Sequence, residues 1–379
     1  MIKDRLTYKD FEILDSIRGI ASAYVMIAHC RGILWIGGSK FLEENPVESW
    51  SLTDYLIFST SLSTRLAVEF VILFFVLSGF SIAYSLKRNS HSISFYKKRL
   101  IRIYPPYLLA LVWAGIVFII TQSMHPDFYS GTYATPTFER YRQMLSFFEL
   151  ETILGNLLYL PSSGFIVQFW SLSHEVIFYA LAPLLILNKY WYYRVSLFLF
   201  LLYITFKNAI PFEDSILTQF IGVYNFYFCI GMLLFDNFSK GSDLIRRIRK
   251  IPALLLTGLV LLCTYGINFM MESETLWSFI PAGITGCLLI LIFLTFKIKI
   301  KWLINLGRHS YSLYITHFAS IILFHSIYYS IVPKESLPYI DRFYVFFLAI
   351  PFCLVVSYLF YHLIEKKTKD LLSKIRLKT

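Results

Sequence analysis

Charged side chains are scarce in this chain. Asp, Glu, Lys and Arg together make up 16% of the 379 residues, whereas 57% of the residues are hydrophobic and 18% are aromatic. A water-soluble domain needs a polar surface, which so few charges cannot supply. The composition therefore excludes a soluble catalytic domain and indicates a polytopic membrane protein.

Cysteine is sparse as well. The five cysteines stand singly in apolar segments, at positions 30, 229, 263, 287 and 353. No two of them have the spacing of a metal site, and they form no disulfide framework. The sequence also contains no internal repeat and no low-complexity tract, and its N-terminus does not have the pattern of a cleavable signal peptide. We expect no metal and no removable leader.

Long apolar stretches account for most of the chain. A hydrocarbon core about 30 Å thick is crossed by a helix of roughly 20 apolar residues. Ten stretches qualify: 13–34, 65–86, 105–122, 168–187, 191–206, 216–236, 252–270, 276–296, 309–331 and 340–363. We predict an all-α protein with about ten transmembrane helices. It forms a single domain over residues 1–379, with short tails at about 1–12 and 364–379.

A further apolar stretch, 141–161, is interrupted by Glu149, Glu151 and Gly155. If it crossed the membrane, every later loop would change sides, and the basic residues at 246–250 would face outward. We therefore predict that it is an interfacial or re-entrant part of a long outer loop.

The distribution of basic residues supports this topology. With the N-terminus inside, 26 of the 35 Lys and Arg residues fall in inner segments. The outer segments hold seven: Lys40, Arg65, Arg140, Arg142, Lys207, Lys334 and Arg342. Because short cytoplasmic loops are rich in Lys and Arg, we predict that both termini are cytoplasmic. The net charge of +11 then reflects this asymmetry and attraction to anionic membrane lipid, and no nucleic-acid partner is expected.

The first predicted helix contains two ionisable side chains, in the segment LDSIRGIASAYVMIAHCRG at 14–32. Arg18 and His29 are eleven residues apart, which is three helical turns plus about 20°, so they share a face. The rise between them is about 16 Å, which places Arg18 near the cytoplasmic boundary and His29 in the outer half of the bilayer. Either both side chains reach the headgroups or packed polar contacts, or they line a functional cavity.

Other segments place ionisable side chains at a matching depth. Glu69 lies near the outer end of the second predicted helix, and QFWSLSHEVIFYALAPLL places His174 and Glu175 in the first turns of the fourth. Carboxylates inside a membrane normally face a cavity or a partner. We therefore expect a polar site near the outer leaflet.

The predicted cytoplasmic side carries a basic run in FYKKRLIRIYPPYLLAL, just before Pro105 and Pro106. Arg99 and Arg102 are three residues apart, so on a helix they point the same way and can bind phosphate together. The run is either an ordinary positive-inside cluster or a site for a phosphate-bearing donor from the cytoplasm.

Five segments together resemble blocks of one family, the integral membrane acyltransferase family three. LDSIRGIASAYVMIAH resembles its first-helix motif, in which Arg and His are separated by ten residues. FFVLSGF, KKRLIRIYP, FWSLSHEVIFYAL and LGRHSYSLYITH resemble its later blocks in the same order. The resemblance extends from about residue 9 to about residue 366. Because the sequence ends soon after the tenth predicted helix, it is similar to the stand-alone form, which lacks a C-terminal soluble esterase-like domain.

This resemblance implies transfer of an acyl group, most often acetyl from acetyl-CoA, to a hydroxyl of a glycan or lipid-linked sugar. Arg99, Arg102 and Arg18 are then candidates for the CoA phosphates. His29 is the candidate general base, because an imidazole with a pKa of about 6.5 suits proton transfer at neutral pH. Glu175, or with less support Glu69, orients this imidazole or holds an acceptor hydroxyl. An acyl-histidine intermediate is an open alternative. The family implies a prokaryotic inner membrane.

Weaker signals complete the predicted substrate site. Trp170 either stacks on a sugar or belongs to the interfacial aromatic belt. Tyr311, Tyr314 and His317 follow one another at spacings of three, so they share a face, and His317 lies about mid-membrane. Other positions are predicted to be structural, namely the close helix-packing site at Ser78 and Gly79 and the histidines His325 and His362.

Two other functions remain possible on the residues alone. A transporter or flippase can use Arg18, His29 and Glu175 as a buried relay, although no repeated half is detectable. A non-catalytic scaffold explains the topology but not the buried charges.

Overall fold

The computed structural model describes residues 8–35, 38–88, 92–133, 135–160, 164–207, 215–240, 249–270, 276–332 and 343–376. These residues form helices, turns and irregular segments, with no strand among them, as the sequence predicts. The ends of both predicted tails and four of the predicted loop charges, Arg246, Arg247, Lys334 and Arg342, lie outside the described residues.

The chain divides into two compact units that interleave along the sequence. The first unit takes Met1–Ser22, Val68–Leu100 and Ser171–Ser310, and the second takes Ala23–Ala67, Ile101–Trp170 and Tyr311–Thr379. Two long helices contribute to both units, α1 (Tyr8–Leu34) and α5 (Ser92–Met124).

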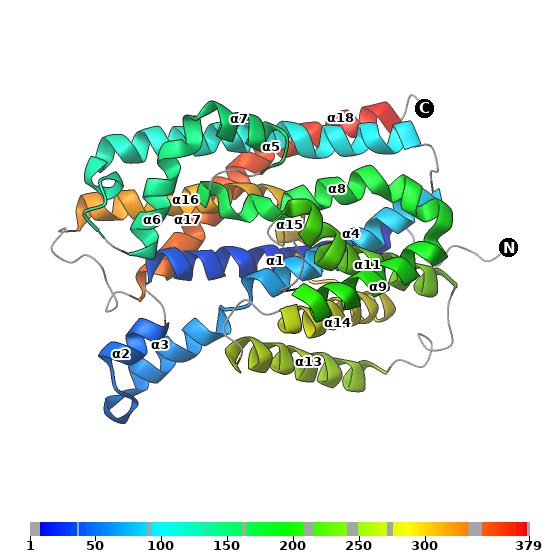
Figure 1. Cartoon of the computed structure of the whole chain (residues 1–379), viewed down its shortest axis with the longest axis horizontal. Helices are drawn as coiled ribbons and strands as arrows, with labels where there is room; N and C mark the ends of the chain where they lie inside the picture. Colours follow the sequence, from blue (N-terminus) through cyan, green and yellow to red (C-terminus); the bar gives the residue numbers. More distant parts are fainter. Residues whose placement is uncertain are drawn as a thin grey trace. The chain divides into compact units, whose positions relative to one another are not determined.

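The first unit also contains α4 (Ala67–Arg88), α8 (Trp170–Leu185), η5 (Ile186–Asn188), α9 (Lys189–Phe206), α10 (Ile216–Gln219), η7 (Phe220–Tyr224), α11 (Asn225–Lys240), α13 (Lys250–Met270), α14 (Leu276–Thr295) and α15 (Lys301–Arg308). In Figure 1, α13 and α14 lie side by side, and they pack against each other.

The second unit contains α2 (Gly38–Glu44), η1 (Val47–Ser49), α3 (Leu52–Ser63), η2 (Pro126–Tyr129), α6 (Pro136–Gln143), η3 (Met144–Phe148), α7 (Leu150–Leu157), η4 (Gly164–Phe169), α16 (Ser310–Ile331), α17 (Val345–Phe360), η9 (Tyr361–Glu365) and α18 (Lys366–Arg376). Figure 1 shows α7 lying along α5, where the Tyr107 hydroxyl donates to the Asn156 carbonyl at 2.7 Å.

Seven helical stretches among the described residues are long and apolar enough to cross a membrane. They are Leu52–Arg88, Ser92–Met124, Ile166–Phe206, Ile216–Lys240, Lys250–Met270, Leu276–Thr295 and Val345–Leu371. Two predicted spans, 168–187 and 191–206, fall within one of these stretches. The predicted spans in α1 and α16 are not among the seven, so the structure confirms a polytopic helical protein but not the count of ten.

The helix α16 carries several polar side chains, and its burial explains why they are tolerated. Every side chain from Ser312 to Leu323 is buried, including Thr316, His317 and Ser320. By contrast, α13 exposes Leu255 and other leucines. A helix enclosed by protein does not need an apolar surface towards lipid, so it can carry polar side chains that lower its mean hydropathy.

The apolar stretch 141–161 is broken into short helices. The end of α6, then η3 and α7, follow one another, and α7 is 8 residues long. None of them reaches the roughly 20 residues that a membrane crossing requires. The segment therefore does not form a membrane-spanning helix, and its place in an outer loop stays a prediction.

The helix that contains the third predicted span begins earlier in the sequence than predicted. Pro105 and Pro106 lie inside α5, which begins thirteen residues before Pro105, at Ser92. Proline has no backbone N–H, so each of these two residues leaves a carbonyl of the preceding helical turn without its usual partner. Nearby, the Tyr311 hydroxyl donates to the Ile103 carbonyl at 2.9 Å. The basic run that precedes the prolines is therefore part of the helix.

Close packing of α4 against α11 confirms the predicted small-residue site. A Cβ atom added at Gly79 would lie 2.0 Å from the Phe228 carbonyl oxygen, and one added at Gly231 would lie 2.1 Å from the Val76 carbonyl oxygen. Each glycine therefore allows the backbones of the two helices to touch.

We expect Gly79→Ala to lower the thermal unfolding midpoint of the purified protein, with a loss of stability of about 1–3 kcal/mol, because the new methyl group overlaps backbone atoms that cannot move aside. Gly258→Ala on α13 is the matched control, because a Cβ atom there meets nothing within 4 Å. Equal midpoints for the two variants would contradict the packing argument.

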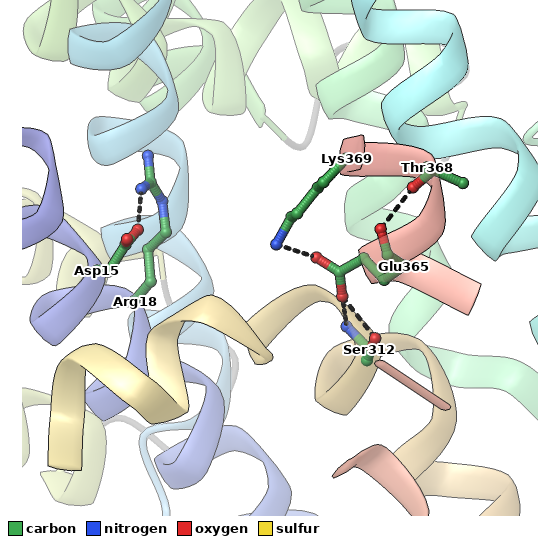
Figure 2. A network of polar contacts seen from close by, with 6 residues as sticks. All are labelled: Asp15, Arg18, Ser312, Glu365, Thr368 and Lys369. Atoms are coloured by element: carbon green, nitrogen blue, oxygen red, sulfur yellow. Dashed lines mark hydrogen bonds and ion pairs between the residues drawn. The ribbon is translucent and has the colours of Figure 1, made fainter. Parts of the chain in front are cut away.

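The N-terminus of α16 is capped by a carboxylate from the C-terminal part of the chain. Glu365 accepts from the backbone N–H of Ser312 at 3.1 Å and from the hydroxyl of the same residue. It also pairs with Lys369 at 2.6 Å (Figure 2). The first N–H groups of a helix have no partner within the helix, and the negative charge of an acid there interacts favourably with the positive end of the helix dipole. Glu365, which is 3% exposed, therefore fixes the start of the helix that carries His317.

Removal of this cap should destabilise the protein. Glu365→Ala leaves the buried Ser312 N–H unpaired, and we expect a loss of about 1–3 kcal/mol in thermal unfolding. Glu365→Gln keeps an oxygen acceptor and should lose less. Glu12→Ala removes an exposed acid that pairs with Arg308 and should have little effect. A midpoint for Glu365→Ala equal to that of Glu12→Ala would refute the capping role.

Candidate functional site

Two histidines from distant parts of the sequence meet within the second unit. The Nδ1 atom of His29 on α1 lies 2.8 Å from the Nε2 atom of His317 on α16. Their rings are nearly parallel, with an interplanar angle of 10°. The structure thus joins the predicted general base to a residue that the sequence assigned to substrate binding.

The hydrogen bonds fix the tautomers of the two neutral imidazoles. The Nδ1 atom of His317 lies 2.9 Å from the Leu313 carbonyl, which can only accept, so the proton of His317 is on Nδ1. Its Nε2 atom therefore accepts from the Nδ1–H of His29. It follows that Nε2 of His29 carries a lone pair, and this atom makes no hydrogen bond with the described residues. A neutral imidazole with a free Nε2 atom is a base or a nucleophile.

The histidine pair is enclosed mainly by aromatic and apolar groups. Phe318 lies edge-on to His29, with ring centroids 5.6 Å apart, and Tyr314 lies 5.9 Å from His317. The thiol of Cys353 on α17 lies against the His317 carbonyl. His317 is 1% exposed, whereas His29 is half-buried, so His29 is the more exposed member of the pair.

The two tyrosines that share a face with His317 hold α16 in place. The Tyr314 hydroxyl donates to the Gln168 carbonyl at 2.9 Å, and the Tyr311 hydroxyl donates to Ile103. Trp170 is half-buried at the first residue of α8, two residues after Gln168. The hydroxyls of Tyr311 and Tyr314 are thus bonded to backbone, and substrate contacts by these residues and by Trp170 remain predictions.

Arg18 belongs to a separate polar cluster in the first unit. Its guanidinium pairs with Asp15 at 2.7 Å (Figure 2). It also donates to the Ser81 hydroxyl on α4 at 2.9 Å. Both side chains of the pair are partly exposed. The guanidinium has five N–H donors, so several remain for a ligand after these two bonds.

Glu175 lies in a second cluster of the first unit. Its Oε1 atom accepts from the Ser78 hydroxyl at 3.2 Å and from the Tyr179 hydroxyl one turn along α8. The guanidinium of Arg99 lies over the Tyr179 ring, 5.3 Å from its centroid. Glu175 and Arg99 therefore share Tyr179 as a neighbour, while the predicted contact of Glu175 with His29 remains a prediction.

Glu69 is buried and bonded to side chains of neighbouring helices. It is 4% exposed, and its Oε1 atom accepts from Asn268 at 2.8 Å and from Ser278 at 2.7 Å. These bonds join α4 to α13 and α14 within the first unit. Arg102, in the part of α5 that belongs to the second unit, is exposed.

The sequence did not predict several of these hydrogen-bond and ion-pair partners, although a local pattern was present for two of them. Asp15 stands three residues before Arg18, and Tyr179 four residues after Glu175, which are the spacings of neighbours on one helix face. Ser81 and the pairing of His29 with His317 have no such signal. Among the described residues, no group of three or more His, Cys, Asp and Glu side chains is placed to hold a metal.

Comparisons with known proteins identify the family of this chain. A curated protein of Haemophilus influenzae, described only as an uncharacterized protein, is 28% identical to this chain over 222 residues, which cover 52% of the chain and 86% of that protein. No solved structure matches the chain. The family described as the acyltransferase domain matches residues 11–362, nearly the whole sequence. The chain therefore belongs to acyltransferase family three.

Proposed function

We propose that this membrane acyltransferase moves an acyl group, most often acetyl, from cytoplasmic acyl-CoA to a hydroxyl of an envelope or extracellular glycan. The observation that carries the proposal is the His29–His317 hydrogen bond, which leaves Nε2 of His29 with a lone pair. Membership of the family supports acyl transfer. The proposed location is a prokaryotic inner membrane, supported by the asymmetry of the Lys and Arg residues.

The proposed reaction uses His29 first as a base and then as an acid. Nε2 takes the proton of the acceptor hydroxyl while the oxygen attacks the thioester carbonyl carbon. The tetrahedral intermediate then collapses, the carbon–sulfur bond breaks, and the CoA sulfur leaves with the proton from Nε2. The products are an ester and free CoA.

His317 is the proposed stabiliser of the charged intermediate state. When His29 becomes an imidazolium, its Nδ1–H still donates to the neutral Nε2 atom of His317. His317 is held in that tautomer by Leu313. The same lone pair on His29 also permits direct attack on the thioester, so an acyl-histidine intermediate remains an alternative mechanism.

The proposed donor site uses Arg18, Arg99 and Arg102. Coenzyme A is polyanionic, and guanidinium groups recognise phosphate through paired N–H donors. Asp15 and Ser81 orient Arg18 without using all its donors. The continuous helix α1 carries both Arg18 and His29, which supports a donor arm that follows this helix. A transporter or flippase is not favoured, because the family match indicates an acyltransferase.

Substitution of the histidines tests the chemistry. In lipid, with labelled acetyl-CoA and total envelope glycan, we expect His29→Ala to lower transfer by about 10²–10⁴-fold, the usual contribution of a general base. CoA binding should be retained. His317→Ala should lower the rate less, and His317→Gln, which keeps a hydrogen-bond acceptor, less still.

The matched control for this test is His362→Ala, because His362 is exposed on η9. It should transfer label as fast as wild type. Equal transfer by His29→Ala and wild type would remove His29 from the chemistry.

Binding of CoA tests the arginines separately from catalysis. We expect Arg18→Gln, Arg99→Gln and Arg102→Gln each to raise the dissociation constant for CoA about tenfold, which corresponds to the loss of one charged hydrogen bond. Arg88→Gln at the end of α4 is the control and should bind normally. A variant that no longer distinguishes CoA from 3′-dephospho-CoA identifies the arginine at that phosphate. Unchanged affinity in all three variants would contradict the proposed donor site.

A further inference from the structure

Arg99 of the proposed donor site lies against two aromatic rings of the first unit. Its guanidinium carbon lies over the ring of Phe95, one turn earlier on α5, at 5.5 Å from the ring centroid. The same carbon lies over the ring of Tyr179 on α8, at 5.3 Å from that centroid. A cation within about 6 Å of a ring centroid is attracted by the negative face of the ring. Rings from two helices therefore contact the cationic group of Arg99.

A hydrogen bond next to these contacts joins the same two helices. The Tyr96 hydroxyl donates to the Ala180 carbonyl at 2.8 Å. Tyr96 stands three residues before Arg99 on α5, so the two side chains share a face of that helix. On α8, Ala180 directly follows Tyr179. The Tyr96 bond therefore holds α5 against α8 at the place where Arg99 meets the Tyr179 ring.

The hydroxyl of Tyr179 is itself bonded to a carboxylate. It donates to the Oε1 atom of Glu175, one turn earlier on α8. The same oxygen accepts from the Ser78 hydroxyl of α4 at 3.2 Å. Groups in a hydrogen-bonded network polarise one another, so a phenol that donates to an anion gains electron density in its ring. The bond to Glu175 therefore makes the face of the Tyr179 ring more attractive to Arg99.

The ring contacts involve a part of the guanidinium that phosphate does not use. The five N–H donors of an arginine lie in the plane of the guanidinium, and phosphate oxygens meet them at its edge. An aromatic ring instead lies over the flat face of the group. Contact with a ring therefore restricts the side chain without competing for the groups that bind phosphate.

This restriction matters because a flexible arginine must be ordered when a ligand binds. Ordering one long side chain lowers the affinity for a ligand by about two- to tenfold. The rings that restrict Arg99 are themselves held, since Phe95 is 4% exposed and the Tyr179 hydroxyl is bonded to Glu175. Arg99 is therefore partly ordered before any ligand arrives.

We propose that Tyr179 is a positioning residue of the donor site: its ring holds Arg99 for a phosphate of acyl-CoA, and Glu175 strengthens this hold through the Tyr179 hydroxyl. The inference rests on the proposed function, which assigns Arg99 to the CoA phosphates. It gives Glu175 a part in donor binding, whereas the sequence-based expectation placed this carboxylate at His29 or at the acceptor hydroxyl.

Equilibrium binding of CoA to the full chain in lipid nanodiscs, without an acceptor, tests the inference. Tyr179→Leu removes the ring, and we expect the dissociation constant for CoA to rise about three- to tenfold. Tyr179→Phe keeps the ring without its hydroxyl, and Glu175→Gln removes the negative charge, so each should raise the constant only about two- to threefold. Turnover at saturating acetyl-CoA should stay within about twofold of wild type in all three variants.

A double-variant cycle shows whether Tyr179 acts through Arg99. In an Arg99→Gln background, Tyr179→Leu should cause no further loss of CoA affinity, because the cation that the ring holds is gone. Tyr193→Phe is the matched control, because the Tyr193 hydroxyl also donates to a carboxylate of the first unit, that of Asp236, at 3.1 Å. This control should bind CoA as wild type does. Thermal unfolding midpoints establish that each variant is folded.

The outcomes separate the inference from the proposed function. Weakened CoA binding in Arg99→Gln beside normal binding in Tyr179→Leu would overturn the inference alone, as would additive losses in the double variant. Slower turnover of Glu175→Gln at saturating donor, with unchanged CoA affinity, would assign Glu175 to the chemistry and would also overturn it. Normal CoA binding in Arg99→Gln would contradict the proposed donor role of Arg99 itself, and the inference with it.

Discussion

A polar side chain inside a membrane must find its partners within the protein, and the second unit depends on this constraint. His317 is possible on α16 only because the side chains around it, from Ser312 to Leu323, are buried. The hydroxyls of Thr316 and Ser320 return to carbonyls of their own helix, at 2.8 Å in each case. With these groups satisfied locally, Nε2 of His317 is left for a single partner, and His29 supplies it.

Three carboxylates among the described residues have structural partners, and none of the three is described as a partner of the histidine pair. Glu69 links three helices of the first unit, Glu175 is bonded to Ser78 and Tyr179, and Glu365 caps α16. A neutral imidazole stabilises the imidazolium of its neighbour less than a carboxylate would. A base of this kind releases its proton readily, which suits the second half of the proposed reaction, where the leaving sulfur must be protonated.

The sequence was most informative where one local rule decides the structure. Hydropathy identified the apolar helices, and small residues at Gly79 identified a helix contact that the structure confirms. It was less informative for α5, because the prolines suggested a helix start, whereas the helix continues through them. The pairing of His29 with His317 joins residues 288 positions apart, and it arises from helix packing that no local pattern encodes.

The charge around Arg18 bears on the proposed donor site. Arg18 has Asp15 beside it, so a phosphate that binds there must compete with an acid already in place. This favours reversible binding of a polyanion that has several phosphates to offer.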